Sequence, residues 1–315
     1  MKSKKFTITF IIVFLSIFLI TPVISYFAIF KIQNFAFYQL YKYQVKKMQN
    51  PKNNYELVFL GDSALGNAVD ADYFTEISGV KAANLALTGV YGFAGSYNFL
   101  KETYRHQKNL KYVVLVHYPG IGSQGDPFTG YIYSFLDPDF RDLKNFSTRE
   151  KLDLLYYSYI FFFNFENYKR FFRGIALHYL GSGNEEGFIV SDYVKQYKKI
   201  EFDEKNANGD SPQSILKDGF IFLKKIADFC QKNNLKLLFV YGTQYEKYFD
   251  LSTDYMAQLN QLIKDQNVLL EEEPVKIPLK KVGDSLNHVD IPYKKEFTKI
   301  YYDRIKNHWD LKNTP

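Results

Sequence analysis

Cysteine is nearly absent from the chain, and this absence excludes several kinds of site. The 315 residues include one cysteine, Cys230, so an internal disulfide framework and a multi-cysteine zinc site are both excluded. Histidine is also scarce. None of the five has the paired spacing of a metal motif such as H-E-x-x-H: His106, His117, His178, His288 and His308. We therefore expect no metal and no cofactor.

Motifs for nucleotides and nucleic acids are missing as well. No P-loop and no dinucleotide-binding fingerprint follows any expected strand. The net charge of +6 comes from lysines spread along the chain, not from a basic stretch interleaved with stacking aromatics. The sequence therefore argues against a nucleic-acid partner.

A long apolar run is present at the amino terminus. It extends from about Phe6 to Phe30 and follows three lysines. Roughly 20 apolar residues suffice to span a bilayer, so residues 1–30 are predicted to be a transmembrane signal anchor. The alternative, a cleaved signal peptide, normally has a shorter apolar region and a small-residue cleavage site.

The lysines around this run bear on its orientation. Those ahead of it favour a cytoplasmic amino terminus, although Lys31, Lys42, Lys46 and Lys47 on the other side oppose that preference. We expect a single-pass protein of the cell membrane whose soluble domain lies on the extracytoplasmic side. Residues 31–54 are predicted to be an amphipathic juxtamembrane helix or linker that ends near Pro51.

The rest of the chain, residues 55–310, alternates strand and helix signals. Buried strands are expected at 56–60, in "KAANLALTG", in "LKYVVLVHYPG" and in "NLKLLFVYG". Helices are expected at about 95–106, after Ser211-Pro212 and near the carboxyl end. This alternation predicts an α/β domain with a central parallel sheet.

One region, residues 121–210, departs from the alternation and contains the unusually aromatic stretch "LLYYSYIFFFNFENYKRFFRG". We interpret it as a helical insertion whose aromatic side chains pack on the core. A hydrophobic face that lies on the membrane or docks a membrane partner is the alternative. A second membrane span is disfavoured because Asn164 and Glu166 interrupt the run.

Three short segments carry groups suited to acyl chemistry. Gly61-Asp62-Ser63 follows the first strand, "NLALTG" ends at Gly89 after the second, and "VGDSLNHVD" contains Asp284 and His288. A serine becomes a nucleophile when a histidine takes its proton, and a carboxylate orients that histidine. Backbone amides must face the developing oxyanion, and open parallel sheets place such groups at the carboxyl ends of their strands.

With these residues in this order, the sequence resembles the SGNH (GDSL-type) hydrolase superfamily. The amino-terminal anchor makes it similar to the membrane-anchored envelope branch, which includes alginate O-acetylation and teichoic-acid D-alanylation proteins. The resemblance covers roughly residues 55–120 and 212–310. It implies a three-layer, flavodoxin-like sandwich around a parallel sheet. It also implies that Ser63 is the nucleophile, His288 the base and Asp284 its partner, with the Ser63 and Gly89 amides in the oxyanion hole.

Two features depart from the family pattern. The family spaces its acid and base as D-x-x-H, whereas Asp284 and His288 are one residue further apart, so Asp290 or a Ser–His dyad are alternatives. The family also supplies an Asn to the oxyanion hole after the third strand, and no such Asn follows here. The substitutes considered are Gly120, Ser123 and Gln124, and His117 is either a site residue or a buried strand histidine.

These observations predict an extracytoplasmic, membrane-anchored serine acyl esterase or O-acyltransferase. Its expected partners are a cell-envelope polysaccharide or lipid-linked glycan, the membrane, and a membrane-bound acyltransferase. The alternative, motivated by the two departures, is a non-catalytic SGNH-like binding or scaffold module in an envelope polysaccharide modification complex.

Overall fold

The computed structural model of the chain describes residues 4–16, 36–123, 214–249 and 253–311, together with positions 130, 148–149, 151–152 and 156. The aromatic stretch at 154–174 lies outside these residues except for Tyr156, and so does Ser211-Pro212.

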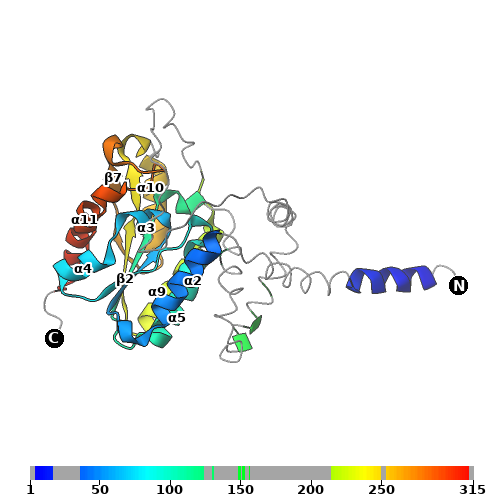
Figure 1. Cartoon of the computed structure of the whole chain (residues 1–315). Helices are drawn as coiled ribbons and strands as arrows, with labels where there is room; N and C mark the ends of the chain where they lie inside the picture. The colour runs from blue at the N-terminus through cyan, green and yellow to red at the C-terminus, as the bar shows by residue number, and fades with distance from the viewer. Residues whose placement is uncertain are drawn as a thin grey trace.

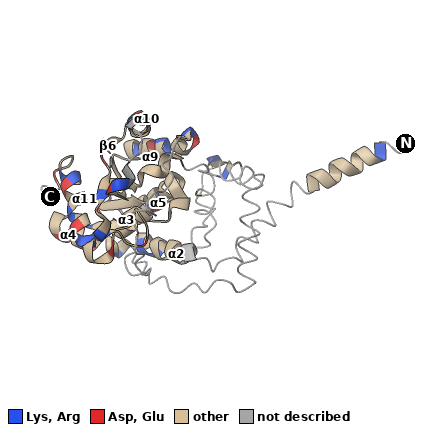
Figure 2. Ribbon diagram, turned by 90° about the horizontal axis from the view of Figure 1, so that it is seen from above, with Lys and Arg blue, Asp and Glu red and all other residues tan. Residues whose placement is uncertain are grey.

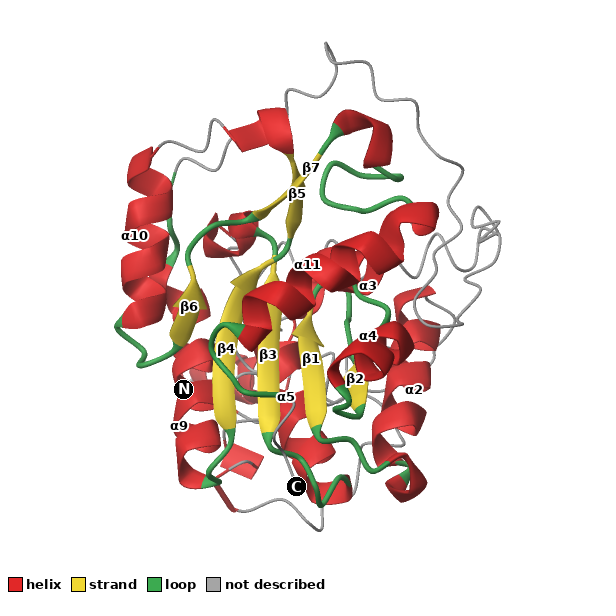
Figure 3. Ribbon diagram, turned by 90° about the vertical axis from the view of Figure 1, so that its left-hand side faces the viewer, coloured by secondary structure: helices red, strands yellow, loops and turns green. Residues whose placement is uncertain are grey.

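A parallel sheet of five strands forms the centre of the described structure, in the order β2-β1-β3-β4-β6 (Figures 1 and 3). All neighbouring pairs in it are parallel. The expected α/β class with a central parallel sheet is confirmed. The strands are β1 (Leu57–Gly61), β2 (Ala82–Asn84), β3 (Tyr112–His117), β4 (Lys236–Tyr241) and β6 (Leu269–Glu271).

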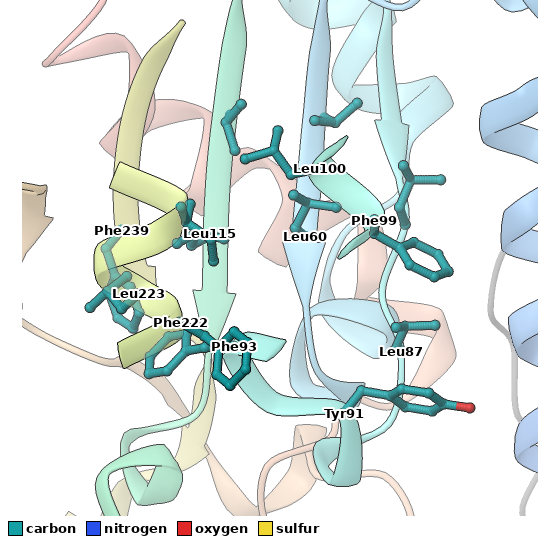
Figure 4. Packing of buried hydrophobic residues seen from close by; sticks show 14 of the residues in the cluster. Leu60, Leu87, Tyr91, Phe93, Phe99, Leu100, Leu115, Phe222, Leu223 and Phe239 are labelled. Carbon is teal, nitrogen blue, oxygen red and sulfur yellow. The ribbon is translucent and has the colours of Figure 1, made fainter. Parts of the chain in front are cut away.

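Strands β1 and β3 are buried on both faces, as their continuous apolar sequences require. Alternate side chains enter two different clusters. Leu60 and Leu115 point into one cluster, and Phe59 and Val114 into the other. Figure 4 shows the first cluster, where aromatic and aliphatic side chains from helices pack against strand residues.

Helices cover both faces of the sheet, and the helices on each face contribute residues to a different cluster. The first cluster contains residues of α2 (Ala36–Gln49), α5 (Gly92–His106), α9 (Phe220–Lys232) and α10 (Thr253–Lys264). The second contains residues of α3 (Ser63–Ala68), α4 (Ala71–Ser78) and α11 (Lys294–Lys306). Short 3-10 segments connect these elements: η1 (Pro51–Asn53), η2 (Gly89–Tyr91), η3 (Pro119–Ser123), η6 (Lys217–Gly219), η7 (Glu246–Phe249), η8 (Leu279–Lys281) and η9 (Ile291–Tyr293).

The helix expected ahead of the domain is α2, and it packs into the core. Tyr41, Val45 and Met48 are buried in the first cluster, and the Gln44 side chain donates to the Ala86 carbonyl at 2.9 Å. Residues 36–49 therefore pack against the sheet domain instead of forming a free linker.

Several elements differ from the sequence expectations. The strand in "KAANLALTG", expected to end near Gly89, ends at Asn84, and α9 begins at Phe220 rather than just after residue 212. A second, two-stranded parallel sheet joins β5 (Thr243–Tyr245) to β7 (Val275–Ile277). Figure 3 shows it beyond the carboxyl ends of the five strands.

At the amino terminus, residues 4–16 form a helix with every side chain exposed. Its basic residues, Lys4 and Lys5, lie in the first turn, and the rest of the helix is uncharged (Figure 2). Residues 17–30 of the apolar run lie outside the described part. Among the described helices, none is long and apolar enough to cross a membrane.

Gly61, the last residue of β1, lies against the backbone of β3. A Cβ atom at this position would be 1.8 Å from the Val116 carbonyl oxygen, and a backbone atom of a central strand cannot move away easily. Gly79 differs, because it has open space around its Cβ position and only its φ of 74° disfavours a side chain.

We predict that Gly61→Ala lowers the free energy of unfolding by about 3 kcal/mol or more, because it overpacks the contact between β1 and β3. Gly79→Ala is the matched control and should cost about 1 kcal/mol, from the left-handed conformation alone. Urea denaturation of the purified chain, followed by circular dichroism, measures both values. Equal losses for the two variants would contradict the steric argument.

Candidate functional site

The order in which successive strands are added to the sheet reverses at β1. The chain goes from β1 outward to β2 and returns to β3 on the other side of β1. Ligands of open parallel sheets bind outside the carboxyl ends of the strands at such a reversal. Asp62 and Ser63 follow β1, and Tyr118 follows β3, so both segments lie at this point.

Ser63 is the first residue of α3 and is partly exposed. The preceding Asp62 caps this helix, since its Oδ1 accepts a hydrogen bond from the Ala64 amide at 2.9 Å. The hydroxyl of Ser63 makes no hydrogen bond to any described residue, so it is available to a ligand or to a base.

The Asp284 and His288 side chains are in contact. His288 Nδ1 lies 2.7 Å from Asp284 Oδ1, and both side chains are largely buried. A proton on Nδ1 makes this contact a hydrogen bond, which leaves Nε2 of the neutral ring free to accept a proton.

A tight turn brings the two residues together despite their unusual spacing. The His288 amide donates to the Ser285 carbonyl at 2.9 Å, and the Gly283 amide donates to the His288 carbonyl at 2.8 Å. An antiparallel bridge between Val282 and Val289 closes the turn. The extra residue is thus accommodated within the turn, and Asp284 reaches the imidazole ring.

Contacts through β5 tie this turn to the helix that begins with Ser63. Thr243 Oγ1 donates to the Asn287 carbonyl at 2.7 Å, and the Tyr245 amide donates to the Leu286 carbonyl at 2.7 Å. β5 in turn packs against α3. The preceding Gly242 lies so close to Ala64 that a Cβ would be 2.9 Å from the Ala64 Cβ. The turn with His288 therefore lies on the same side of the sheet edge as Ser63.

Gly89 lies at the same edge, on the other side of β1. The segment after β2 continues beside β1, because the Leu87 amide donates to the Gly61 carbonyl at 2.9 Å. Gly89 follows two residues later and begins η2. In the described structure the backbone amides of Ser63 and Gly89 have no hydrogen-bond acceptor, so both remain available as donors.

Asn84, which opens the "NLALTG" segment, has a structural role. Its amide group donates to the carbonyls of Leu65 and Val69, and its Oδ1 accepts from the Ala86 amide at 3.0 Å. These bonds hold the segment after β2 against α3, and they occupy both the amide nitrogen and the oxygen of the Asn84 side chain.

The candidates for a third oxyanion donor remain without support. Gly120 is buried under the Tyr118 ring, and the Ser123 hydroxyl donates to the Gly120 carbonyl at 2.8 Å. Gln124 lies outside the described residues.

His117 is a buried strand histidine, with none of its surface exposed. Its Nε2 lies 3.2 Å from Ser96 Oγ, and its Nδ1 lies 3.5 Å from Asp62 Oδ2. The same Asp62 oxygen accepts a hydrogen bond from the Tyr118 amide at 3.0 Å. Sequence reasoning did not identify this network. Its only local signal is an acidic residue between Gly61 and Ser63.

No family model, curated protein or solved structure matches the chain. The function must therefore be inferred from the geometry of the site. In the described ranges, no group of three or more histidine, cysteine or acidic side chains is placed to hold a metal ion. Burial raises the pKa of Cys230 to about 12, so its thiol is unsuited to act as a nucleophile.

The two helix caps Asp62 and Asp70 offer a matched test of the buried network. Asp62 uses both carboxylate oxygens, on the amides of Ala64 and Tyr118, whereas Asp70 uses only Oδ1, on two amides of α4. Asn caps a helix about as well as Asp, but it has a single acceptor oxygen.

We therefore predict that Asp62→Asn lowers the free energy of unfolding by about 1–3 kcal/mol, because one buried amide loses its acceptor. Asp70→Asn should change it by no more than about 0.5 kcal/mol. Urea denaturation measures both, and similar values for the two variants would refute the role assigned to Asp62.

Proposed function

We propose that the protein is a membrane-anchored, extracytoplasmic serine esterase or O-acyltransferase of the SGNH type that acts on a cell-envelope polysaccharide or glycan. The observation that carries this proposal is the 2.7 Å contact between His288 Nδ1 and Asp284 Oδ1. It supplies an oriented histidine in a turn tied to the helix that begins with Ser63.

The strand order supports the proposed SGNH-like fold. A parallel sheet in the order β2-β1-β3-β4-β6 corresponds to the 2-1-3-4-5 order of flavodoxin-like folds, with helices on both faces. Such folds host many activities, so the assignment of an activity relies on the site residues and not on the fold.

In the proposed reaction, Ser63 Oγ attacks the carbonyl carbon of an ester while its proton passes to His288 Nε2. The carbon–oxygen bond to the alcohol then breaks, and the alcohol leaves with the proton from His288. Water or a sugar hydroxyl next attacks the acyl-serine ester, giving its proton to His288, and Ser63 is released with that proton. Asp284 orients the ring and stabilises its charged form.

The amides of Ser63 and Gly89, which have no acceptor among the described residues, supply donors for the oxyanion in this proposal. Removal of one such donor typically lowers the rate about 10²–10³-fold, so a site with two donors is expected to be slower than one with three. Transfer to a sugar requires that water be kept from the acyl-enzyme. A membrane-bound acyltransferase is the proposed source of acyl groups.

Labelling of Ser63 by a fluorophosphonate probe tests the chemistry directly. Ser63→Ala should abolish labelling, and His288→Ala should slow it about 10²–10⁴-fold, since a general base contributes that much. Asp284→Asn should also slow labelling, because it disturbs the ring's tautomer and orientation. Asp290→Asn is the control and should label at the wild-type rate. Mass spectrometry of the labelled chain measures each rate.

The alternative is a non-catalytic module that binds the polysaccharide or a partner enzyme. One observation favours it, namely that within the described residues the Ser63 hydroxyl makes no hydrogen bond to His288. Catalytic hydrogen bonds often tighten only when substrate binds, so the catalytic proposal stays first. Wild-type protein that resists the probe, together with unchanged envelope acylation in Ser63→Ala cells, would establish the alternative.

A further inference from the structure

The first helix of the domain, α2, has a definite direction relative to the sheet. Near its amino end, the Tyr41 ring stacks on the Tyr91 ring with centroids 5.6 Å apart, and Tyr91 belongs to the same short helix as Gly89. The Gln44 side chain donates to the carbonyl of Ala86, in the segment that leads to Gly89. The amino end of α2 therefore lies beside the carboxyl ends of the strands, which we call the carboxyl edge of the sheet.

The other end of α2 lies at the opposite edge. The Gln107 side chain donates to the carbonyls of Met48 and Asn50, and its oxygen accepts from the Tyr55 amide. Gln107 follows α5 and precedes β3, at the edge where the strands begin. α2 thus runs from the edge that carries Ser63 to the edge farthest from it.

This direction limits where the apolar amino-terminal run can lie. The run ends near Phe30, and α2 begins at Ala36. Six residues of fully extended chain cover about 21 Å at about 3.5 Å each. A bilayer that holds the run is therefore within that distance of the end of α2 that lies at the carboxyl edge.

The aromatic insertion starts and ends at this edge as well. The Leu216 amide donates to the Gly122 carbonyl at 2.8 Å, so the chain leaves the domain and returns to it at neighbouring points just beyond β3. Gly130, inside the insertion, touches Tyr91, and a Cβ on it would be 2.2 Å from the Tyr91 carbonyl oxygen. Between these points the sequence contains the aromatic stretch 154–174, which includes the basic residues Lys169, Arg170 and Arg173.

We infer that the carboxyl edge of the sheet is the surface of this domain that faces the lipid bilayer. The two most apolar segments of the chain both join the domain there, and the basic residues of the insertion suit anionic lipid headgroups. On the proposed function, Ser63 and His288 open toward the membrane, and the substrate is an ester or hydroxyl compound attached to lipid.

The orientation can be measured without any assumption about catalysis. Val90 is 48 % exposed at the carboxyl edge, and Asn109 is exposed at the opposite edge. The two edges are separated by the length of β3, about 20 Å at about 3.3 Å per residue. Val90→Cys and Asn109→Cys place a fluorescent maleimide at each edge, while buried Cys230 with its raised pKa resists labelling.

Each labelled chain is reconstituted in vesicles of phosphatidylethanolamine and phosphatidylglycerol that contain lipid with a nitroxide on its headgroup. We expect the label at residue 90 to lose most of its fluorescence and the label at residue 109 to lose none. Equal quenching at both residues, or stronger quenching at residue 109, would overturn the inference. Neither result depends on whether Ser63 is a nucleophile.

A spacer variant tests the substrate class. A proline-rich insertion of about 20 residues after Gln33 adds about 60 Å between the apolar run and α2. Turnover of an acetyl ester attached to vesicle lipid should fall at least tenfold, and turnover of soluble 4-methylumbelliferyl acetate should not change. Equal turnover of the lipid ester with and without the spacer would overturn the assigned substrate class. If wild-type protein and Ser63→Ala hydrolyse the soluble ester equally, the proposed function fails, and the quenching result still decides the orientation.

Discussion

The close approach of β1 and β3 at their carboxyl ends is the constraint on which the site depends. Only a hydrogen atom fits on the Cα of Gly61, because the Val116 carbonyl occupies the space of a side chain. The carboxylate of Asp62 can therefore accept hydrogen bonds from two segments at once, the start of α3 and the end of β3. A single buried acid thus holds the two loops together, and Ser63 is the residue next to it. Buried acids that are fully bonded in this way restrict the conformations of the loops they join.

The sequence predicted the central part of the fold and missed its periphery. The strands β1, β3 and β4 are continuous apolar runs, which is why their positions could be read locally. The three-residue strands β5, β6 and β7 carry too few residues for a periodic signal, and their pairing depends on partners elsewhere in the chain. A juxtamembrane helix or linker was expected where α2 lies, but its packing on the sheet could not be predicted, because no local pattern reveals that Tyr41 and Met48 fit a distant core.

The candidate site residues also differ in how far the sequence alone could indicate them. Ser63, Gly89 and His288 could be proposed because each follows a recognisable strand or occurs in a short motif. The partner of His288 could not be chosen from spacing, since the choice depends on a turn closed by bonds between backbone groups. The contact between Asp62 and His117 could not be predicted either, because it joins the residue after β1 to the last residue of β3, 55 positions away. Local patterns identify polar residues that follow strands, whereas tertiary contacts decide which of these residues lie close together.

The hydrogen bond between Leu216 and Gly122 has a consequence for how the protein tolerates change. It brings together two points that are far apart in the chain, so the segment between them leaves the sheet domain and returns to it at neighbouring positions. The entropy of closing a flexible loop grows only with the logarithm of its length, and a doubling adds about 0.6 kcal/mol. Segments of very different length and composition can therefore replace one another at this position with little effect on the stability of the sheet.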